Sequence, residues 1–187
     1  MSLLLDILDI FHPRQPAALS HPETRQAAAD AASDEELQLT DECIQLIEKD
    51  EGDILTAYPD PGSGGEPWTI GYGHTGPDVH PGLTITQAQA EALLEKDLDK
   101  FEDDVADAIG DAKTTNNQFS AMVSFAYNVG TGGLQTSSVL RFHNAGQYAQ
   151  ADDAFLLWDK SCGKVMAGLT RRRHQEREMY LGLAIDP

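Results

Sequence analysis

The clearest hydrophobic pattern in the chain runs from Leu94 to Ile109. Apolar residues recur there at spacings of 4, 3, 4 and 4, at Leu94, Leu98, Phe101, Val105 and Ile109. This is the period of an amphipathic α-helix. Thr86, followed three residues later by Gln89, forms a capping-box pattern that predicts the start of this helix. We expect a long helix whose acidic outer face is solvated, a face that includes Glu91, Glu95, Asp99, Glu102 and Asp103.

Shorter helical patterns lie on both sides of the long helix. Thr40 is the expected N-cap of a helix that ends at Glu51 and Gly52. Asn116 or Asn117 is the expected cap of a helix whose core side is formed by Phe119, Met122, Val123 and Ala126. Further helices are expected over residues 137–146, with Ser137 as the cap, and over residues 151–158 and 170–181.

Residues 54–72 follow a different pattern, rich in glycine and proline. Turn sequences at 59–62 and 63–67 separate short apolar runs, and residues 68–72 alternate as a strand does. Two or three short strands are expected. The fold class is therefore α+β, a small strand-rich lobe joined by the long helix to a larger helical lobe.

Length and charge limit the classes of function. A chain of 187 residues with 41% apolar content suits one domain with a tail. The formal net charge of −18 argues against nucleic acid or an anionic membrane as a partner held by bulk electrostatics. Only residues 139–187, with 6 acids and 7 bases, are not acidic.

Residues 1–39 are expected to form an N-terminal extension or linker. Residues 1–11 are apolar but contain two aspartates and no basic residue, so they do not fit a secretory signal. No stretch approaches the roughly 20 apolar residues that span a bilayer. We expect the protein to accumulate inside the cell that makes it. The apolar start either packs on the domain itself or docks onto a partner.

The two cysteines, Cys43 and Cys162, are expected to be free thiols, with a disulfide between them as the alternative. Neither has His or Cys neighbours at the spacing of metal ligands, and no metal or other cofactor is expected.

Two carboxylic acids stand out as candidates for chemistry. Ile44, Ile47 and Glu51 fall on one helix face, which places Glu51 at the end of an apolar stripe. Partial burial there disfavours the charged form, as a general acid near neutral pH requires. Asp60 lies in a Pro-Asp-Pro-Gly turn, where it is expected to be solvated and ionised. Two carboxyl groups in such contrasting settings are typical of enzymes that cleave glycosidic bonds.

These residues resemble the catalytic region of the phage-type lysozymes, the endolysins of glycoside hydrolase family 24. The resemblance rests on Glu51, Asp60 and Thr69, with the run Thr-Ile-Gly-Tyr-Gly-His-Thr over residues 69–75. It continues through residues 117–130 and 168–173 and covers roughly residues 40 to 183. It implies a lysozyme-like fold, with residues 40–187 as the catalytic domain.

The resemblance also implies an activity. The expected reaction is hydrolysis of the β-1,4 bond between N-acetylmuramic acid and N-acetylglucosamine in peptidoglycan, with inversion. Glu51 would protonate the leaving oxygen, Asp60 would activate a water as the base, and Thr69 would hold that water through its hydroxyl group. Inversion needs the two carboxyl groups about 6.5 to 9.5 Å apart.

Several further residues are expected to support the site. The family places an arginine of its closing helix against the catalytic acid, and Arg172 is the candidate, with Arg173 as the neighbouring alternative. The alternative is that Arg171, Arg172 and Arg173 have no role in the site and form solvent-facing pairs with Glu176 and Glu178. His74 is expected to be a structural histidine bonded to a carboxylate. The residues expected to line the sugar groove are Tyr72, Gly73 and Asn128.

The chain departs from the family in its acidity, since many of these wall-degrading enzymes are basic. Two alternatives stay open: a lytic transglycosylase on the same fold, and a virion-associated lysozyme or sugar-binding module anchored by residues 1–39. As an endolysin the protein would wait in the host cytoplasm until a holin-like partner permeabilises the membrane, and would then act on the cell wall in the periplasm.

Overall fold

The computed structural model of the chain describes residues 36–59 and 64–185. Residues 1–35, most of the predicted N-terminal extension, lie outside the described residues, and so does Asp60. The extension and its docking role therefore stay predictions.

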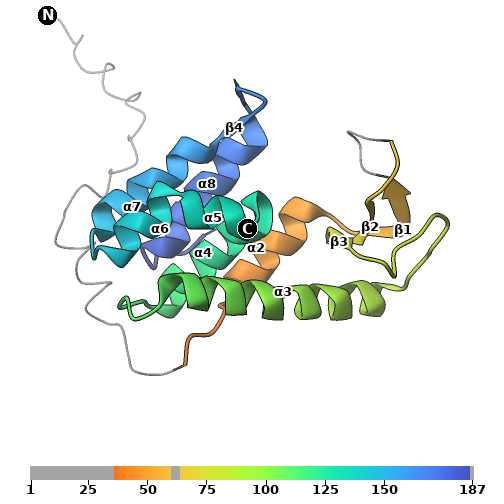
Figure 1. The fold of residues 1–187 in the computed structure, drawn as a ribbon, viewed down its shortest axis with the longest axis horizontal. Helices are drawn as coiled ribbons and strands as arrows, with labels where there is room; N and C mark the ends of the chain where they lie inside the picture. Colours follow the sequence, from red (N-terminus) through yellow and green to blue (C-terminus); the bar gives the residue numbers. More distant parts are fainter. Residues whose placement is uncertain (1–35, 60–63, 186–187) are drawn as a thin grey trace, which may run out of the picture.

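The described residues form two lobes that share one long helix (Figure 1). Helix α3 (Gln87–Ile109) contacts a small antiparallel sheet near its start and three helices of the larger lobe further along. The sheet has the order β1-β2-β3, with strands β1 (Ile54–Pro59), β2 (Trp68–Gly71) and β3 (His74–Thr75). The predicted α+β class, with a strand lobe and a helical lobe, is confirmed.

Helix α4 (Asn116–Val129) is the centre of the helical lobe. Every residue from Gln118 to Ala126 is buried, because α2 (Asp41–Glu51), α3 and α8 (Ala167–Tyr180) all pack against it. Shorter helices complete the lobe: α5 (Thr131–Thr136), α6 (Ser138–Asn144), α7 (Tyr148–Phe155) and the 3-10 helix η1 (Leu156–Trp158). A two-stranded hairpin, β4 (Lys160–Ser161) and β5 (Lys164–Val165), connects η1 to α8.

The helix caps follow local hydrogen-bonding chemistry. Thr40 accepts from the backbone N–H of Cys43, and the capping box between Thr86 and Gln89 is complete, so both predicted caps are confirmed. The predicted cap of α4 is wrong. Thr115, not Asn116 or Asn117, caps this helix, because its hydroxyl accepts from the N–H of Gln118 while the Gln118 side chain accepts from the N–H of Thr115.

The predicted helix boundaries in the C-terminal third need correction. Ser137 caps α6 as expected, but the helix ends at Asn144 and not at Gly146. The helix expected over residues 151–158 begins at Tyr148, and its last three residues are a 3-10 turn. The helix expected over residues 170–181 begins one turn earlier, at Ala167, and ends at Tyr180. Helix α5 and the β4–β5 hairpin were not predicted.

The core explains the state of the two cysteines. Cys43 is fully buried in the helical lobe, whereas Cys162 is exposed in the β4–β5 hairpin, so both thiols are free as predicted. Among the described residues, no helix combines the length and the apolar content needed to cross a lipid bilayer.

Candidate active site

Glu51 is the last residue of helix α2. Ile47, one turn earlier on the same face, is fully buried, whereas the Glu51 side chain is 24% exposed. Gly52 ends the helix with a φ of 73°, a left-handed value that glycine adopts without strain. The apolar stripe of α2 therefore ends in a carboxyl group that is partly shielded from water.

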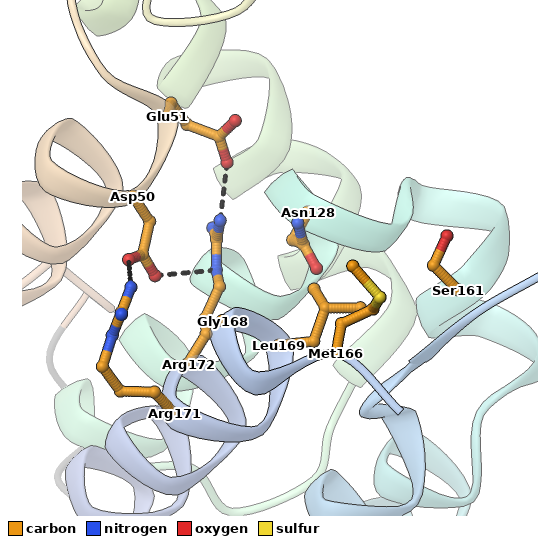
Figure 2. Close-up of a pocket in the computed structure, with 9 residues that line it drawn as sticks. All are labelled: Asp50, Glu51, Asn128, Ser161, Met166, Gly168, Leu169, Arg171 and Arg172. Atoms are coloured by element: carbon orange, nitrogen blue, oxygen red, sulfur yellow. Dashed lines mark hydrogen bonds and ion pairs between the residues drawn. The ribbon is translucent and has the colours of Figure 1, made fainter. Parts of the chain in front are cut away.

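Arg172 from helix α8 holds this carboxyl group. Its Nη1 donates to Glu51 Oε1 at 2.6 Å, which is the ion pair predicted from the sequence (Figure 2). The same guanidinium donates through Nη2 to the backbone oxygen of Ser124 at 3.1 Å and through Nε to Glu176 Oε1 at 3.2 Å. Burial alone would lower the pKa of Arg172, but the negative charges of Glu176 and Glu51 raise it, so the arginine stays cationic.

Glu176 lies beneath Arg172 and has no solvent exposure. It also forms an ion pair with Arg173, whose Nε lies 2.7 Å from Glu176 Oε2, and it accepts from the hydroxyl of Ser124 at 3.0 Å. Arg173 is buried as well and stacks over the ring of Phe125, with its guanidinium carbon 4.9 Å from the ring centroid. The alternative of solvent-facing arginine pairs is therefore excluded for Arg172 and Arg173.

The turn after strand β2 approaches Glu51 from the strand-rich lobe. Gly73 has a φ of +95°, and a Cβ built on it would lie 3.8 Å from Glu51 Oε2. Tyr127 of α4 fixes this turn, because its hydroxyl donates to the backbone oxygen of Tyr72 at 2.8 Å. The ring of Tyr72 itself packs in the core, and its hydroxyl accepts from Gln87. The backbone at residue 73, more than the Tyr72 side chain, borders the acid.

His74 is a buried structural histidine, as predicted. Its Nδ1 lies 2.7 Å from Asp97 Oδ2 on helix α3, and its Nε2 lies 3.3 Å from Asp78 Oδ2. These bonds tie strand β3 to the long helix and to the loop that follows the strand. The pKa of Asp78 is lowered, first by a hydrogen bond to its own backbone and also by the hydrogen bond to His74.

A pocket of about 400 Å³ opens beside Glu51 and Arg172 (Figure 2). Asn128, one of the predicted groove residues, lines it, and its side-chain oxygen accepts from Arg173 at 3.1 Å. The other lining residues are Asp50, Ser161, Met166, Gly168, Leu169 and Arg171. Asp50 pairs with Arg171 at 2.8 Å, so both acids of the pocket wall face an arginine. The part of the chain that the structure describes has no cluster of acidic, His and Cys side chains arranged to hold a metal ion.

Sequence comparison decides the family. The phage lysozyme family model matches residues 48–176. The chain belongs to the phage lysozyme family. An endolysin of Bacillus phage B103 is 50% identical over 114 residues, which are 61% of this chain and 43% of the relative. An endolysin of Salmonella phage P22 is 38% identical over 149 residues, which are 78% of this chain and 99% of the relative.

Solved structures of phage lysozymes and related domains share the fold. The muramidase domain of SpmX from Asticaccaulis excentricus superposes with a TM-score of 0.70 at 33% identity, over 78% of this chain and 99% of that one. A mutant of P22 lysozyme gives a TM-score of 0.65 at 35% identity, again over 78% of this chain and 99% of the other. The chain spans about half the length of the Bacillus phage endolysins that it matches.

Two of the three residues that the phage lysozyme motif implies as catalytic are described. Glu51 borders the pocket, and Thr69 lies in the middle of the sheet, where its register partners are Tyr58 on β1 and Thr75 on β3. Asp60 lies outside the described residues, so the separation of the two carboxyl groups stays a prediction. The roles of Asp60 and Thr69 stay predictions too.

Sequence reasoning missed several residues around the acid. Glu176 entered the sequence analysis only as a solvent-facing partner in the alternative interpretation of the arginines, yet it is the buried counterion of Arg172. Glu176 lies four residues after Arg172 on the same helix, and this spacing could have indicated from the sequence that the two side chains pair. Ser161 and Met166 were missed because they lie in, and directly after, a hairpin that has only two residues in each strand.

Proposed function

We propose that this protein is a muramidase that hydrolyses the β-1,4 bond between N-acetylmuramic acid and N-acetylglucosamine in peptidoglycan. The observation that carries the proposal is the position of Glu51. It is a partly buried carboxyl group at the wall of a pocket, held 2.6 Å from Arg172, in a chain of the phage lysozyme family. One oxygen of Glu51 is held by Arg172, which leaves the other available to a substrate.

In the proposed reaction Glu51 donates a proton to the leaving glycosidic oxygen. Asp60 acts as the base that activates a water on the opposite face of the sugar, and the hydroxyl of Thr69 holds that water. Attack by this water inverts the anomeric centre, and no covalent intermediate forms. Arg172 keeps the Glu51 side chain in one orientation through its own hydrogen bonds to Ser124 and Glu176. The lining residue Asn128 and the backbone at Gly73 contribute to the sugar groove.

The proposal extends to how the protein reaches its substrate. Residues 40–187 form the catalytic domain and residues 1–39 an extension. The enzyme accumulates in the host cytoplasm, a holin-like partner opens the membrane, and the enzyme then acts on the wall in the periplasm. A cell that expresses the protein alone should keep growing, and addition of a membrane-permeabilising agent should trigger lysis.

The first test removes the acid. Glu51→Gln should reduce the clearing of purified peptidoglycan at least about 100-fold, because general acid catalysis contributes on that order. Glu48→Gln is the matched control, since Glu48 lies on the same helix one turn earlier and outside the pocket. Clearing by Glu51→Gln at the wild-type rate would overturn the assignment.

The second test analyses the products. Mass spectrometry of purified peptidoglycan digested by the wild-type protein should show hydrated muramic acid ends, and Asp60→Asn should produce them at least about 100-fold more slowly. Anhydro-muramic acid products would identify a lytic transglycosylase instead.

A further inference from the structure

Arg172 lies beside a third carboxylate in addition to Glu51 and Glu176. Its Nε is 3.7 Å from Asp50 Oδ2, an ion pair that is too long for a hydrogen bond (Figure 2). The Asp50 side chain is 6% exposed and the Arg172 side chain 4%. Within residues 36–59 and 64–185, Asp50 Oδ2 accepts no hydrogen bond. Asp50 therefore places a shielded, negatively charged oxygen beside the guanidinium that holds the candidate acid.

The other oxygen of Asp50 binds Arg171. Arg171 Nη2 donates to Asp50 Oδ1 at 2.8 Å, but the Arg171 side chain is 57% exposed. Water screens a charge at such a position, so Arg171 compensates the charge of Asp50 only in part. The side chain of Arg172 is almost fully buried, and its attraction to Asp50 is screened much less.

The charges of this pocket wall balance one another. Three carboxylates, those of Asp50, Glu51 and Glu176, face the three consecutive arginines 171–173. A general acid carries a proton before it reacts, so the wall has one positive charge in excess whenever Glu51 is ready to act. Arg172 loses the charge of its closest partner in that state.

The ion pair that orients Glu51 also opposes the protonated state that the reaction needs. A guanidinium at 2.6 Å favours the ionised form of a carboxyl group. A second carboxylate beside the same guanidinium acts in the opposite direction, because a like charge favours the protonated form of Glu51. Glu176 lies 3.2 Å from Arg172, but it is shared with Arg173 at 2.7 Å. Asp50 is next to Glu51 in the sequence and has one oxygen available.

The other elements that pack around Glu51 present neutral groups to it. Burial, followed by the charges of Asp97 and Glu51, raises the pKa of Tyr127 on helix α4, so its hydroxyl stays neutral. The strand-rich lobe approaches Glu51 with the turn at Gly73, which has no side chain. Neither group supplies a negative charge that could replace Glu51 as the partner of Arg172.

We propose that Asp50 is a positioning residue for the acid, and that its carboxylate compensates the charge of Arg172 while Glu51 carries its proton. This inference rests on the proposed muramidase function, in which Glu51 is the acid. Arg172 then stays in place through its hydrogen bonds to Ser124 and Glu176, and it keeps Glu51 oriented toward the leaving oxygen. Asp50 thereby extends to higher pH the range in which Glu51 can donate a proton.

The pH dependence of the rate tests the role of Asp50 apart from folding. In a profile of kcat/KM on purified peptidoglycan, the alkaline limb reports the loss of the proton from the acid. Asp50→Asn removes the like charge and should move this limb to lower pH by about 1 unit, the size expected for a neighbouring charge. Asp41→Asn makes the same change at the exposed far end of α2 and should leave the limb at its wild-type position.

Removing the counterion of Asp50 should shift the limb in the opposite direction. In Arg171→Gln the charge of Asp50 is no longer partly compensated, so the alkaline limb should move to higher pH. This variant changes an exposed side chain, so it tests the same charge even where Asp50→Asn does not fold. Arg141→Gln, at an exposed position of α6, is its control. An unmoved limb in Asp50→Asn, an equal shift in Asp41→Asn, or a shift to lower pH in Arg171→Gln would overturn the proposal.

Titration of the acid itself separates this inference from the proposed function, because it needs no substrate. In carbon-13 NMR spectra, the carboxyl signal that disappears in Glu51→Gln identifies Glu51. The midpoint of its titration should move to lower pH in Asp50→Asn. This shift in a protein that cleaves no glycan would contradict the proposed function and support the role of Asp50. An unchanged midpoint in an active enzyme would overturn the role of Asp50 and leave the muramidase function standing.

Discussion

Arg172 and Glu51 are 121 positions apart in the sequence, yet their side chains meet at 2.6 Å. The arginine is 4% exposed and also binds Ser124 on α4 and Glu176 on its own helix. It therefore joins three helices at the point where the candidate acid lies. The planar guanidinium makes this possible, because it presents several donors in fixed directions.

Replacing Arg172 with lysine tests this connection. A lysine has one ammonium group and cannot bind all three partners in their present directions. We expect kcat/KM on peptidoglycan to fall about 10- to 100-fold, together with a loss of about 1 to 3 kcal/mol in the free energy of unfolding. Arg141→Lys, at an exposed position of α6, is the control for the substitution itself. Full activity in Arg172→Lys would show that the guanidinium geometry is unimportant.

Glu176 is the buried counterion of two buried arginines, so its charge should matter for stability. Glu176→Gln leaves Arg172 and Arg173 without their shared carboxylate, and breaking a buried ion pair from one side costs about 3 to 5 kcal/mol. Urea denaturation should show a loss of this size. The exposed Glu178, two residues later, should tolerate the same change within about 0.5 kcal/mol. An equal loss of the free energy of unfolding in Glu176→Gln and Glu178→Gln would contradict the buried ion pairs of Glu176 with the two arginines.

The two carboxylate partners of His74, Asp97 and Asp78, should contribute unequally to the free energy of unfolding. The bond to Asp97 is 2.7 Å long and largely shielded, whereas Asp78 lies at 3.3 Å with 57% of its side chain exposed. Asp97→Asn is expected to lower the free energy of unfolding by about 1 to 2 kcal/mol, and Asp78→Asn by less than about 1 kcal/mol. The comparison is made by urea denaturation at pH 6. A larger loss at Asp78 would reverse this ranking.

The features that the sequence predicted well depend on local chemistry. The long helix follows from the spacing between Leu94 and Ile109, and its start follows from a capping box that needs only Thr86 and Gln89. Glu51 could be placed at a helix end because Ile47 and Gly52 flank it. In each case the responsible interactions lie within one or two helical turns.

The features that the sequence did not predict depend on distant partners. The cap of α4 is the exception, because Thr115 and Gln118 form a local capping box, with two hydrogen bonds, that the sequence already contains. The sequence around Glu176 is typical of a surface residue. In the structure α8 packs on α4, and two arginines and Ser124 surround the Glu176 carboxylate. The β4–β5 hairpin is too short for a periodic pattern, and its pairing appears only in three dimensions.

The two cysteines should differ in reactivity. Burial, and after it the nearby charge of Glu176, raises the pKa of Cys43 to about 12, and its thiol donates to the backbone oxygen of Ser120. Cys162 is exposed. A thiol reagent at pH 8 should label one equivalent per folded chain within minutes and a second only in denaturant. Cys162→Ser should abolish the fast phase, and a persistent fast phase would show that Cys43 is accessible.

His143 of helix α6 is fully buried, and its hydrogen bonds to Thr114 and Tyr180 suit a neutral ring. The hydroxyl of Thr114 donates to the backbone oxygen of Ala112, so it accepts from His143 Nε2–H at 2.8 Å. The other ring nitrogen, Nδ1, then accepts from the hydroxyl of Tyr180 at 2.6 Å. Burial lowers the pKa of His143 from 6.5 to about 4.

Stability should therefore fall as the pH drops below the ordinary range of a histidine. In the unfolded chain His143 takes up a proton near pH 6.5, whereas in the folded chain it does so only near pH 4. Its contribution is fully present above pH 6.5 and is lost as the pH falls toward 4, by about 3 kcal/mol in all. His143→Gln keeps a donor and an acceptor but does not titrate, so its free energy of unfolding should depend less on pH across this window. Parallel pH profiles from urea denaturation, or an NMR titration of the wild-type His143 ring near pH 6.5, would contradict the buried neutral state.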